Sequence, residues 1–128
     1  MKLFLFCLMF FASSTSNAYQ YDGEYSGKGE GDLSMTIITL DSEKEVEAVS
    51  IGTGSNGCGG GMTGVGTVVG NTLKFQNYTK EEGAENCVLS IAFKEGKKGK
   101  KTATVSEGEG CYFFHGTACG FSGTLRQK

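Results

Sequence analysis

The sequence predicts an all-β protein, an antiparallel eight-stranded up-and-down barrel, with a β-sandwich as the alternative. Apolar and polar residues alternate in several short runs, as in strands with one buried face. Glycine-rich or charged turns separate these runs at short intervals, and no stretch has convincing helical periodicity. Short connections favour up-and-down order, and closing the sheet into a barrel leaves no free edge on strands without proline.

The strands can be placed from this alternation. The clearest lies around Leu89, Ile91 and Phe93, and Gly70-Asn71 is typical of a two-residue hairpin turn. The expected strands cover residues 19–27, 33–37, 46–51, 62–69, 72–75, 89–93 and 102–106, followed by a closing strand near the C-terminus.

Two segments need a separate interpretation. In residues 46–51 the apolar positions change phase between Ala48 and Val49, which predicts a β-bulge. Residues 52–61 are rich in glycine and are expected to form a loop around Cys58.

The N-terminal segment predicts export. Lys2 supplies a positive n-region, residues 3–11 form an apolar h-region, and Ser16-Asn17-Ala18 fits a small-x-small cleavage site. We therefore expect residues 1–18 to be a signal peptide and residues 19–128 to be a single domain. The apolar run is too short to cross a bilayer. These features predict a periplasmic or secreted protein without stable membrane insertion after cleavage.

The four cysteines that follow the signal peptide are expected to pair in two disulfides, because exported domains of this size rely on such bridges. They are Cys58, Cys87, Cys111 and Cys119. Three pairings are possible. A hairpin with His115-Gly116 at its tip would place Cys111 opposite Cys119, which favours this bridge together with Cys58–Cys87.

Composition and motifs argue against several functional classes. The chain has 14 acidic and 12 basic residues, and this mild acidity argues against nucleic acid as a partner. Gly52-Thr-Gly-Ser-Asn-Gly57 matches the dinucleotide fingerprint, but Cys-Gly-Gly-Gly follows where a helix must begin. Cys111, His115 and Cys119 lack a fourth zinc ligand. We expect no cofactor and no metal.

Catalysis is not predicted either. His115 is the only histidine, no Gly-x-Ser-x-Gly elbow accompanies it, and it is expected to be a turn residue packed beside Phe113 or Phe114. The acidic pairs Asp22/Glu24 and Glu107/Glu109 could serve a glycoside hydrolase. Solvated turn charges explain them more simply. The sequence therefore predicts that the protein is not an enzyme.

The cysteine, glycine and aromatic pattern supports a resemblance. Residues 111–126 read Cys-x3-His-Gly-x2-Cys-x-Phe-x-Gly-x-Leu-Arg, preceded by Gly-Asn-x-Leu and Cys-x-Leu-x-Ile-x-Phe. This resembles small exported bacterial proteins, and the strand pattern is similar to that of periplasmic lysozyme inhibitors and other calycin-like barrels. The inhibitors' Ser-Gly-x-x-Tyr loop is not matched, because Lys-Gly-Glu follows Ser26-Gly27. No functional residue is therefore transferred.

The resemblance implies an exported protein that binds a protein of the cell envelope, in its most concrete form an inhibitor of a cell-wall hydrolase such as lysozyme. Mild acidity suits a cationic target. The expected contact loops are residues 54–61, 81–86 and 112–118. The candidate partner-binding residues are Ser55, Asn56, Glu81, Glu82, Tyr112, Phe114 and His115.

Two other functions stay open. A small-ligand carrier of the calycin type would use the barrel interior, although eight strands leave an interior that side chains can fill. A small hydrolase would use the acidic pairs or His115. The expected interior residues are Leu33, Met35, Ile37, Leu73, Phe75, Leu89, Ile91 and Phe93.

Overall fold

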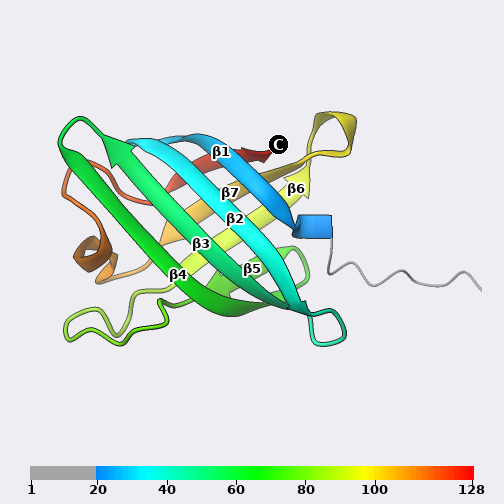
Figure 1. Cartoon of the computed structure of the whole chain (residues 1–128), viewed down its shortest axis with the longest axis horizontal. Coiled ribbons are helices and arrows are strands. Elements are labelled where there is room, and N and C mark those ends of the chain that lie inside the picture. Colours follow the sequence, from blue (N-terminus) through cyan, green and yellow to red (C-terminus); the bar gives the residue numbers. More distant parts are fainter. Residues whose placement is uncertain (1–19) are drawn as a thin grey trace, which may run out of the picture.

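The computed structural model describes residues 20–128, so the expected signal peptide lies outside the described residues. Eight antiparallel strands form a closed barrel in which each strand pairs with its neighbours in the chain, and β8 pairs with β1 (Figure 1). The predicted all-β, up-and-down barrel is confirmed. Within residues 20–128, no helix is long and apolar enough to span a membrane.

The connections between the strands are short except for two. Long segments follow β5 and β7, and short 3-10 turns form η2 (Lys97–Gly99) and η3 (Cys111–Phe114). The strands are β1 (Gly23–Gly29), β2 (Asp32–Asp41), β3 (Val46–Ser55), β4 (Cys58–Val69), β5 (Thr72–Phe75), β6 (Leu89–Glu95), β7 (Lys101–Glu107) and β8 (Gly123–Gln127).

Side chains fill the interior of the barrel. Inward positions alternate with outward ones along each strand, and the eight interior residues predicted from the sequence are all buried in one cluster. Tyr25 of β1 and Leu125 of β8 belong to the same cluster and pack where these two strands close the barrel, and Phe121 lies in it just before β8. An eight-stranded barrel is just wide enough for such a packed interior.

Glycine allows the strands to approach one another at the seam between β1 and β8. A Cβ atom at Gly27 would overlap the carbonyl group of Thr124, and one at Gly29 would overlap that of Ser122. A second close approach occurs between β4 and β5, where a Cβ at Gly64 would overlap the carbonyl of Gln76. Part of the glycine content is therefore required by closure of the barrel.

The prediction of a glycine-rich loop at residues 52–61 is wrong. β3 and β4 continue through this segment and form a hairpin that turns at Asn56 and Gly57, with Gly57 at φ +73°. Gly52 pairs with Gly61, and Gly54 with Gly59. Backbone hydrogen bonds of the ladder need no side chains, so glycine-rich segments can remain strands when their neighbours hold them.

The predicted bulge between Ala48 and Val49 is also wrong. β3 alternates regularly because Glu47, rather than Ala48, faces the interior. The shift in register lies instead in β2, between Thr39 and Asp41. Because Glu47 is charged, the regular alternation of this strand is not recognisable in the sequence.

The two disulfides join different cysteines from the predicted ones. Cys58 is bonded to Cys119 and Cys87 to Cys111, with Cα–Cα separations of 6.0 and 4.8 Å. Residues 111–114 form η3, and the chain then crosses the end of the barrel without forming a hairpin. Cys111 and Cys119 therefore do not face each other. Two disulfides fit an oxidising compartment.

Candidate functional site

The three loops predicted to contact a partner lie at one end of the barrel, which we call the disulfide end (Figure 1). It consists of the connections β1–β2 (residues 30–31), β3–β4 (56–57), β5–β6 (76–88) and β7–β8 (108–122). Both disulfides lie here. Cys58–Cys119 ties the 108–122 segment to the start of β4, and Cys87–Cys111 ties it to the 76–88 segment.

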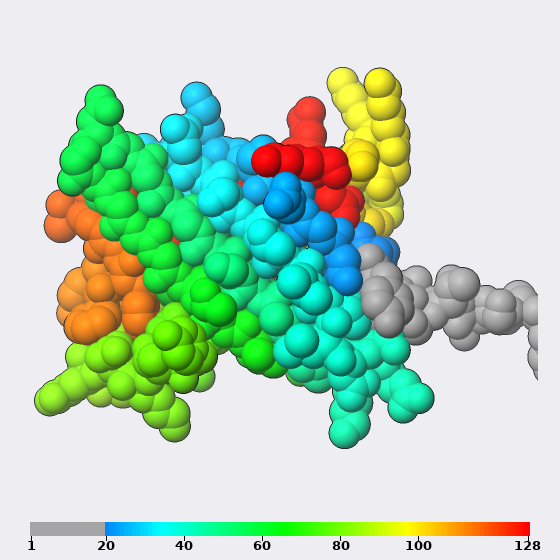
Figure 2. All heavy atoms as spheres, in the orientation of Figure 1, coloured from blue at the N-terminus to red at the C-terminus, as the bar shows by residue number. Residues whose placement is uncertain are grey.

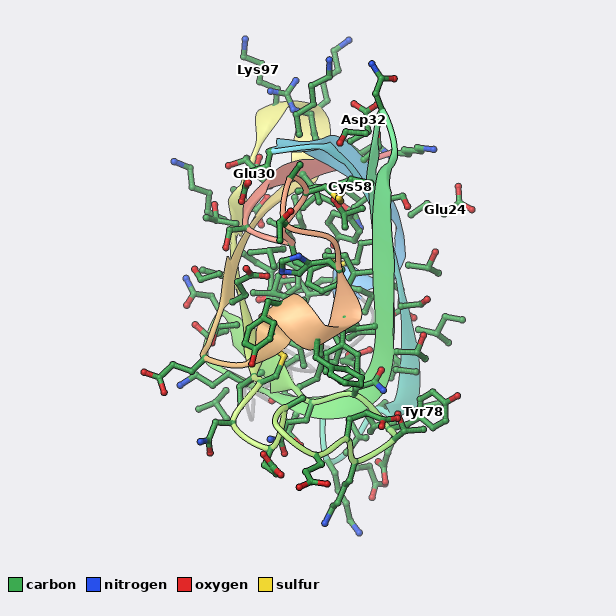
Figure 3. All side chains as sticks on the ribbon, turned by 90° about the vertical axis from the view of Figure 1, so that its left-hand side faces the viewer. Glu24, Glu30, Asp32, Cys58, Tyr78 and Lys97 are labelled. Atoms are coloured by element: carbon green, nitrogen blue, oxygen red, sulfur yellow. A yellow bond between two sulfur atoms is a disulfide. The ribbon has the colours of Figure 1, made fainter. Side chains whose placement is uncertain are left out.

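Figure 3 views the molecule from this end, with η3 across its centre, Cys58 above and Tyr78 below. A β-bridge between Gly60 and His115 and a hydrogen bond from the Gly116 N–H to the Gly59 carbonyl add to the tether at Cys58. The 108–122 segment is therefore held at both sides, although it contains no strand.

The side chain of His115 lies below the surface of the 108–122 segment and helps to hold the segment in place. Its Nε2 lies 3.0 Å from Glu107 Oε2, and its Nδ1 lies 2.6 Å from the carbonyl oxygen of Gly116. The imidazole side chain is only 7% exposed and packs edge-on against Phe121 at 5.0 Å, whereas Phe113 and Phe114 pack on each other. Both ring nitrogens lie within hydrogen-bond distance of an oxygen atom, so contacts within the protein fix the orientation of the ring.

Glu107 links the histidine to the rest of the barrel. Its Oε2 atom also accepts a hydrogen bond of 3.1 Å from the Phe121 N–H, and its own N–H donates to the Ser122 hydroxyl. One carboxylate thus fixes both halves of the 108–122 segment. The side chains of His115 and Glu107 are occupied by contacts within the protein, which supports a structural role for both.

Replacing His115 with alanine is expected to lower the free energy of unfolding by about 2 kcal/mol, because the change leaves the Glu107 carboxylate without one of its hydrogen-bond partners and removes the packing against Phe121. Urea unfolding measures this effect, and faster hydrogen exchange at the Phe121 amide would show that the segment has loosened. Tyr112→Ala is the matched control on η3. Since Tyr112 is exposed, its loss should change stability by less than about 0.5 kcal/mol. Equal effects of the two variants would contradict this role for His115.

The surface of the disulfide end carries exposed aromatic rings. Tyr78, Tyr112 and Phe113 are 77%, 69% and 51% exposed, whereas Phe114 is half-buried and packs against the core. A surface depression of about 260 Å³ lies between residues 76–80 and Phe114. Aromatic side chains are enriched in protein interfaces, so this surface has the composition of a contact site.

The structure places each candidate partner-binding residue at this end, but not all of them at its surface. Ser55 and Asn56 are exposed at the tip of the β3–β4 hairpin, and Glu82 is exposed in the 76–88 segment. Glu81 is half-buried. His115 lies below the surface, as described above. The sequence interpretation did not select Phe113, although it lies in the predicted contact loop 112–118, and Tyr78 lies just before the predicted loop 81–86.

The charges of the molecule are unequally divided between its ends. The connections at the disulfide end contain five acidic residues and one lysine, Lys80. At the opposite end, residues 20–22, 42–45, 70–71, 96–100 and 128 contain five lysines and three acidic residues. Backbone N–H groups of Glu85 and Gly83 hydrogen-bond the Glu85 carboxylate and lower its pKa. The disulfide end is therefore acidic. The acidic residues are Glu30, Glu81, Glu82, Glu85 and Glu109.

A second group of ionisable residues lies near the opposite end of the barrel. The Thr39 hydroxyl lies 2.6 Å from Asp22 Oδ1 and 3.1 Å from Glu47 Oε1. Glu47 is completely buried, and its Oε2 atom has no hydrogen-bond partner among the described residues. Burial, followed by the nearby charge of Asp22, raises the pKa of Glu47 to about 7.

The hydrogen bonds agree with a protonated Glu47. A hydroxyl group carries one hydrogen, so Thr39 cannot donate to two carboxylates at once. A proton on Glu47 resolves this, because Glu47 then donates to Thr39 and Thr39 donates to Asp22. Sequence reasoning missed Glu47. The alternation of Val49 and Ile51, extended back by two residues, was the signal that could have found it.

The acidic pairs considered for hydrolysis have separate partners. Asp22 binds the backbone N–H and hydroxyl of Thr39, while Glu24 is exposed near Lys128. Glu107 binds His115, and Glu109 is exposed in the following turn. Among residues 20–128, no group of three or more His, Cys, Asp or Glu side chains has the geometry of a metal site.

The chain was compared with models of protein families, with curated proteins and with solved structures, and none of these comparisons finds a match.

Proposed function

We propose that this chain is an exported binding protein whose disulfide end docks against a protein of the cell envelope. In its most concrete form the partner is a cell-wall hydrolase such as lysozyme, which the protein inhibits. One observation supports this proposal most directly. Exposed aromatic rings and carboxylates gather on loops that two disulfides fix to a packed barrel.

Fixed loops favour binding because less conformational entropy is lost when the partner docks. Tyr112 and Phe113 project from η3, whose first residue, Cys111, is bonded to Cys87. Large aromatic side chains on such a rigid support are typical of residues that dominate binding energy. The filled interior favours surface binding over carriage of a small ligand, and the contacts made by His115 and Glu107 favour binding over catalysis.

Charge favours a cationic partner. The acidic residues at the disulfide end would attract a basic protein and orient this end toward it, while the lysines at the other end would be turned away. Such steering raises the association rate more than the final affinity, and it weakens as salt is added.

Turnover of cell walls by lysozymes of different classes, with and without an excess of this protein, tests the proposal. We expect at least one lysozyme to be inhibited.

The double variant Tyr112→Ala/Phe113→Ala should lower the affinity at least tenfold, since it removes two exposed rings and leaves the core intact. Glu81→Lys/Glu82→Lys should weaken inhibition most at low salt.

Lys97→Glu/Lys98→Glu is the matched control, because it reverses two charges at the opposite end. It should leave inhibition unchanged. Unchanged turnover with every lysozyme class would exclude this form of the proposal, and equal losses in the lysine and glutamate variants would exclude the disulfide end as the site.

A further inference from the structure

The outer face of β2, β3 and β4 is nearly free of charge. Five outward positions on β2, five on β3 and six on β4 contain one charged residue, Asp32, at the edge of the face. The outer surfaces of the other strands include Glu24, Lys74, Lys94 and Arg126. Figure 2 views the molecule from the side of this face.

This face has an apolar half. Ile38, Leu40, Val65 and Val69 are 56%, 59%, 55% and 75% exposed. Ile38 and Val65 flank Ala48 in direct cross-strand register, so they form a continuous apolar row. Contiguous exposed apolar surface on a folded domain marks a contact with another molecule more often than it occurs by chance.

In the other half of the face, the outward residues of β3 and β4 are glycines, whereas β2 contributes Ser34 and Asp32. Gly52 pairs with Gly61 and Gly54 with Gly59, and a row of hydroxyl residues at the level of Ser50 separates them from the apolar half. Because these glycines have no side chains, this half is lower than the apolar half. The face therefore has a raised end and a recessed end.

Barrel geometry does not require these four glycines. None of them has a positive φ angle. An added Cβ would lie 3.3 Å from its nearest atom at Gly52, 3.4 Å at Gly61, 3.8 Å at Gly59 and 4.0 Å at Gly54. Glycine weakens a strand interior by roughly 0.5–1 kcal/mol relative to alanine. These glycines therefore lower the stability of the strands, and closure of the barrel does not explain why they are present.

We propose that a second copy of this chain covers this face. A two-fold axis across the strands at the level of Ser50 would reverse the strand direction and lay each strand over the same strand of the other copy. On β3 and β4, the raised apolar residues of each copy would then lie over the recessed glycines of the other, with Val65 over Gly61. Such a contact is isologous, because the same surface serves both copies. The two disulfide ends would point in opposite directions and remain free.

Charge and area support a second copy of the chain. Apart from Asp32 at the end of β2, the contact removes no charged side chain of this face from water, whereas a cationic partner would find a single carboxylate there. Ten residues at about 3.4 Å and three strands at about 4.8 Å give about 500 Å² per copy. The total of about 1,000 Å² is at the lower limit for a specific interface, so the dimer should be weak.

Sedimentation velocity of the full mature chain over a range of concentrations tests this. We expect a dimer at on the order of 100 µM protein. Ile38→Lys/Val65→Lys places charges in the apolar half and should raise the dissociation constant at least tenfold. Thr104→Lys is the control, because this exposed outward residue lies on β7, outside the face, and should leave association unchanged.

Filling the recessed half with side chains distinguishes the proposed dimer from nonspecific apolar association. Gly59→Val/Gly61→Val makes the surface more apolar, so nonspecific association would increase. The proposed dimer would instead weaken at least tenfold, because the hollow is lost, while the monomer stays folded. A monomer at about 1 mM, or stronger association of the valine variant, would overturn the proposal. Inhibition of a hydrolase is measured separately and does not depend on this face.

Discussion

Replacing both Cys58 and Cys119 with alanine is expected to lower the free energy of unfolding by about 4 kcal/mol. The two residues are 61 positions apart in the chain, so their bond removes much of the freedom of the unfolded state. In the folded state the same bond fixes the 108–122 segment to β4. Typical domains are stable by about 5–15 kcal/mol, so the loss is a large part of the total.

The other disulfide provides the matched comparison. Cys87 and Cys111 are 24 positions apart, and their double alanine variant is expected to lose about 3.5 kcal/mol on the same basis. Urea unfolding of both variants at one pH gives the two values. A peptide that joins Cys111 to Cys119 in a digest of the unreduced protein would contradict the pairing, and a larger loss from the shorter loop would contradict the chain-entropy explanation.

The barrel could be predicted from the sequence because its strands have a simple period. Leu89, Ile91 and Phe93 alternate with smaller or polar residues and are all buried, as expected. The disulfides could not be predicted in this way. Spacing alone does not distinguish a hairpin from η3 and the irregular chain that follows it. Cysteine pairing depends on how that chain crosses the end of the barrel.

The candidate loops were found in the sequence, but their shared location was not recognised. In an up-and-down barrel every second connection lies at the same end. The connections β1–β2, β3–β4, β5–β6 and β7–β8 must therefore meet once the strand order is known. The burial of His115 was harder to foresee, because it depends on Glu107 and Phe121, which become its neighbours only in the folded chain.

Glu47 was missed for an energetic reason. A charged side chain inside a barrel is costly, so the sequence interpretation placed the smaller Ala48 inside. In the structure, Thr39 and Asp22 provide the polar environment for Glu47. Asp22 precedes β1, and its contact with β2 is not visible in any sequence pattern.

Wild-type protein is expected to become less stable as the pH rises from 5 to 8, and Glu47 is the main cause. Its pKa is about 7 in the folded state, against 4.5 for an unperturbed carboxyl group. The folded protein therefore holds this proton more tightly than the unfolded chain. Stability from Glu47 is complete below pH 4.5 and is lost as the pH rises through 7. The difference corresponds to about 3 kcal/mol.

Glu47→Gln tests this most directly, because the amide keeps the shape of the protonated carboxyl group and cannot ionise. Urea unfolding between pH 5 and pH 8 should show a much smaller loss of stability in this variant than in the wild type. At pH 8 the variant should be the more stable of the two. Glu24→Gln is the control, since that carboxylate is exposed and its change should leave the wild-type slope intact.

The difference between the two proteins in how stability changes with pH separates the effect of Glu47 from that of the other ionisable groups around it. Asp22 and Glu45 both contribute negative charge that raises its pKa, and they remain present in both proteins. If Glu47→Gln loses as much stability as the wild type between pH 5 and pH 8, then Glu47 is already ionised at pH 5. The fold would then have to accommodate a buried carboxylate beside Asp22. In that case the hydrogen bonds of Thr39 would need a different arrangement, because its single hydrogen serves only one of the two carboxylates.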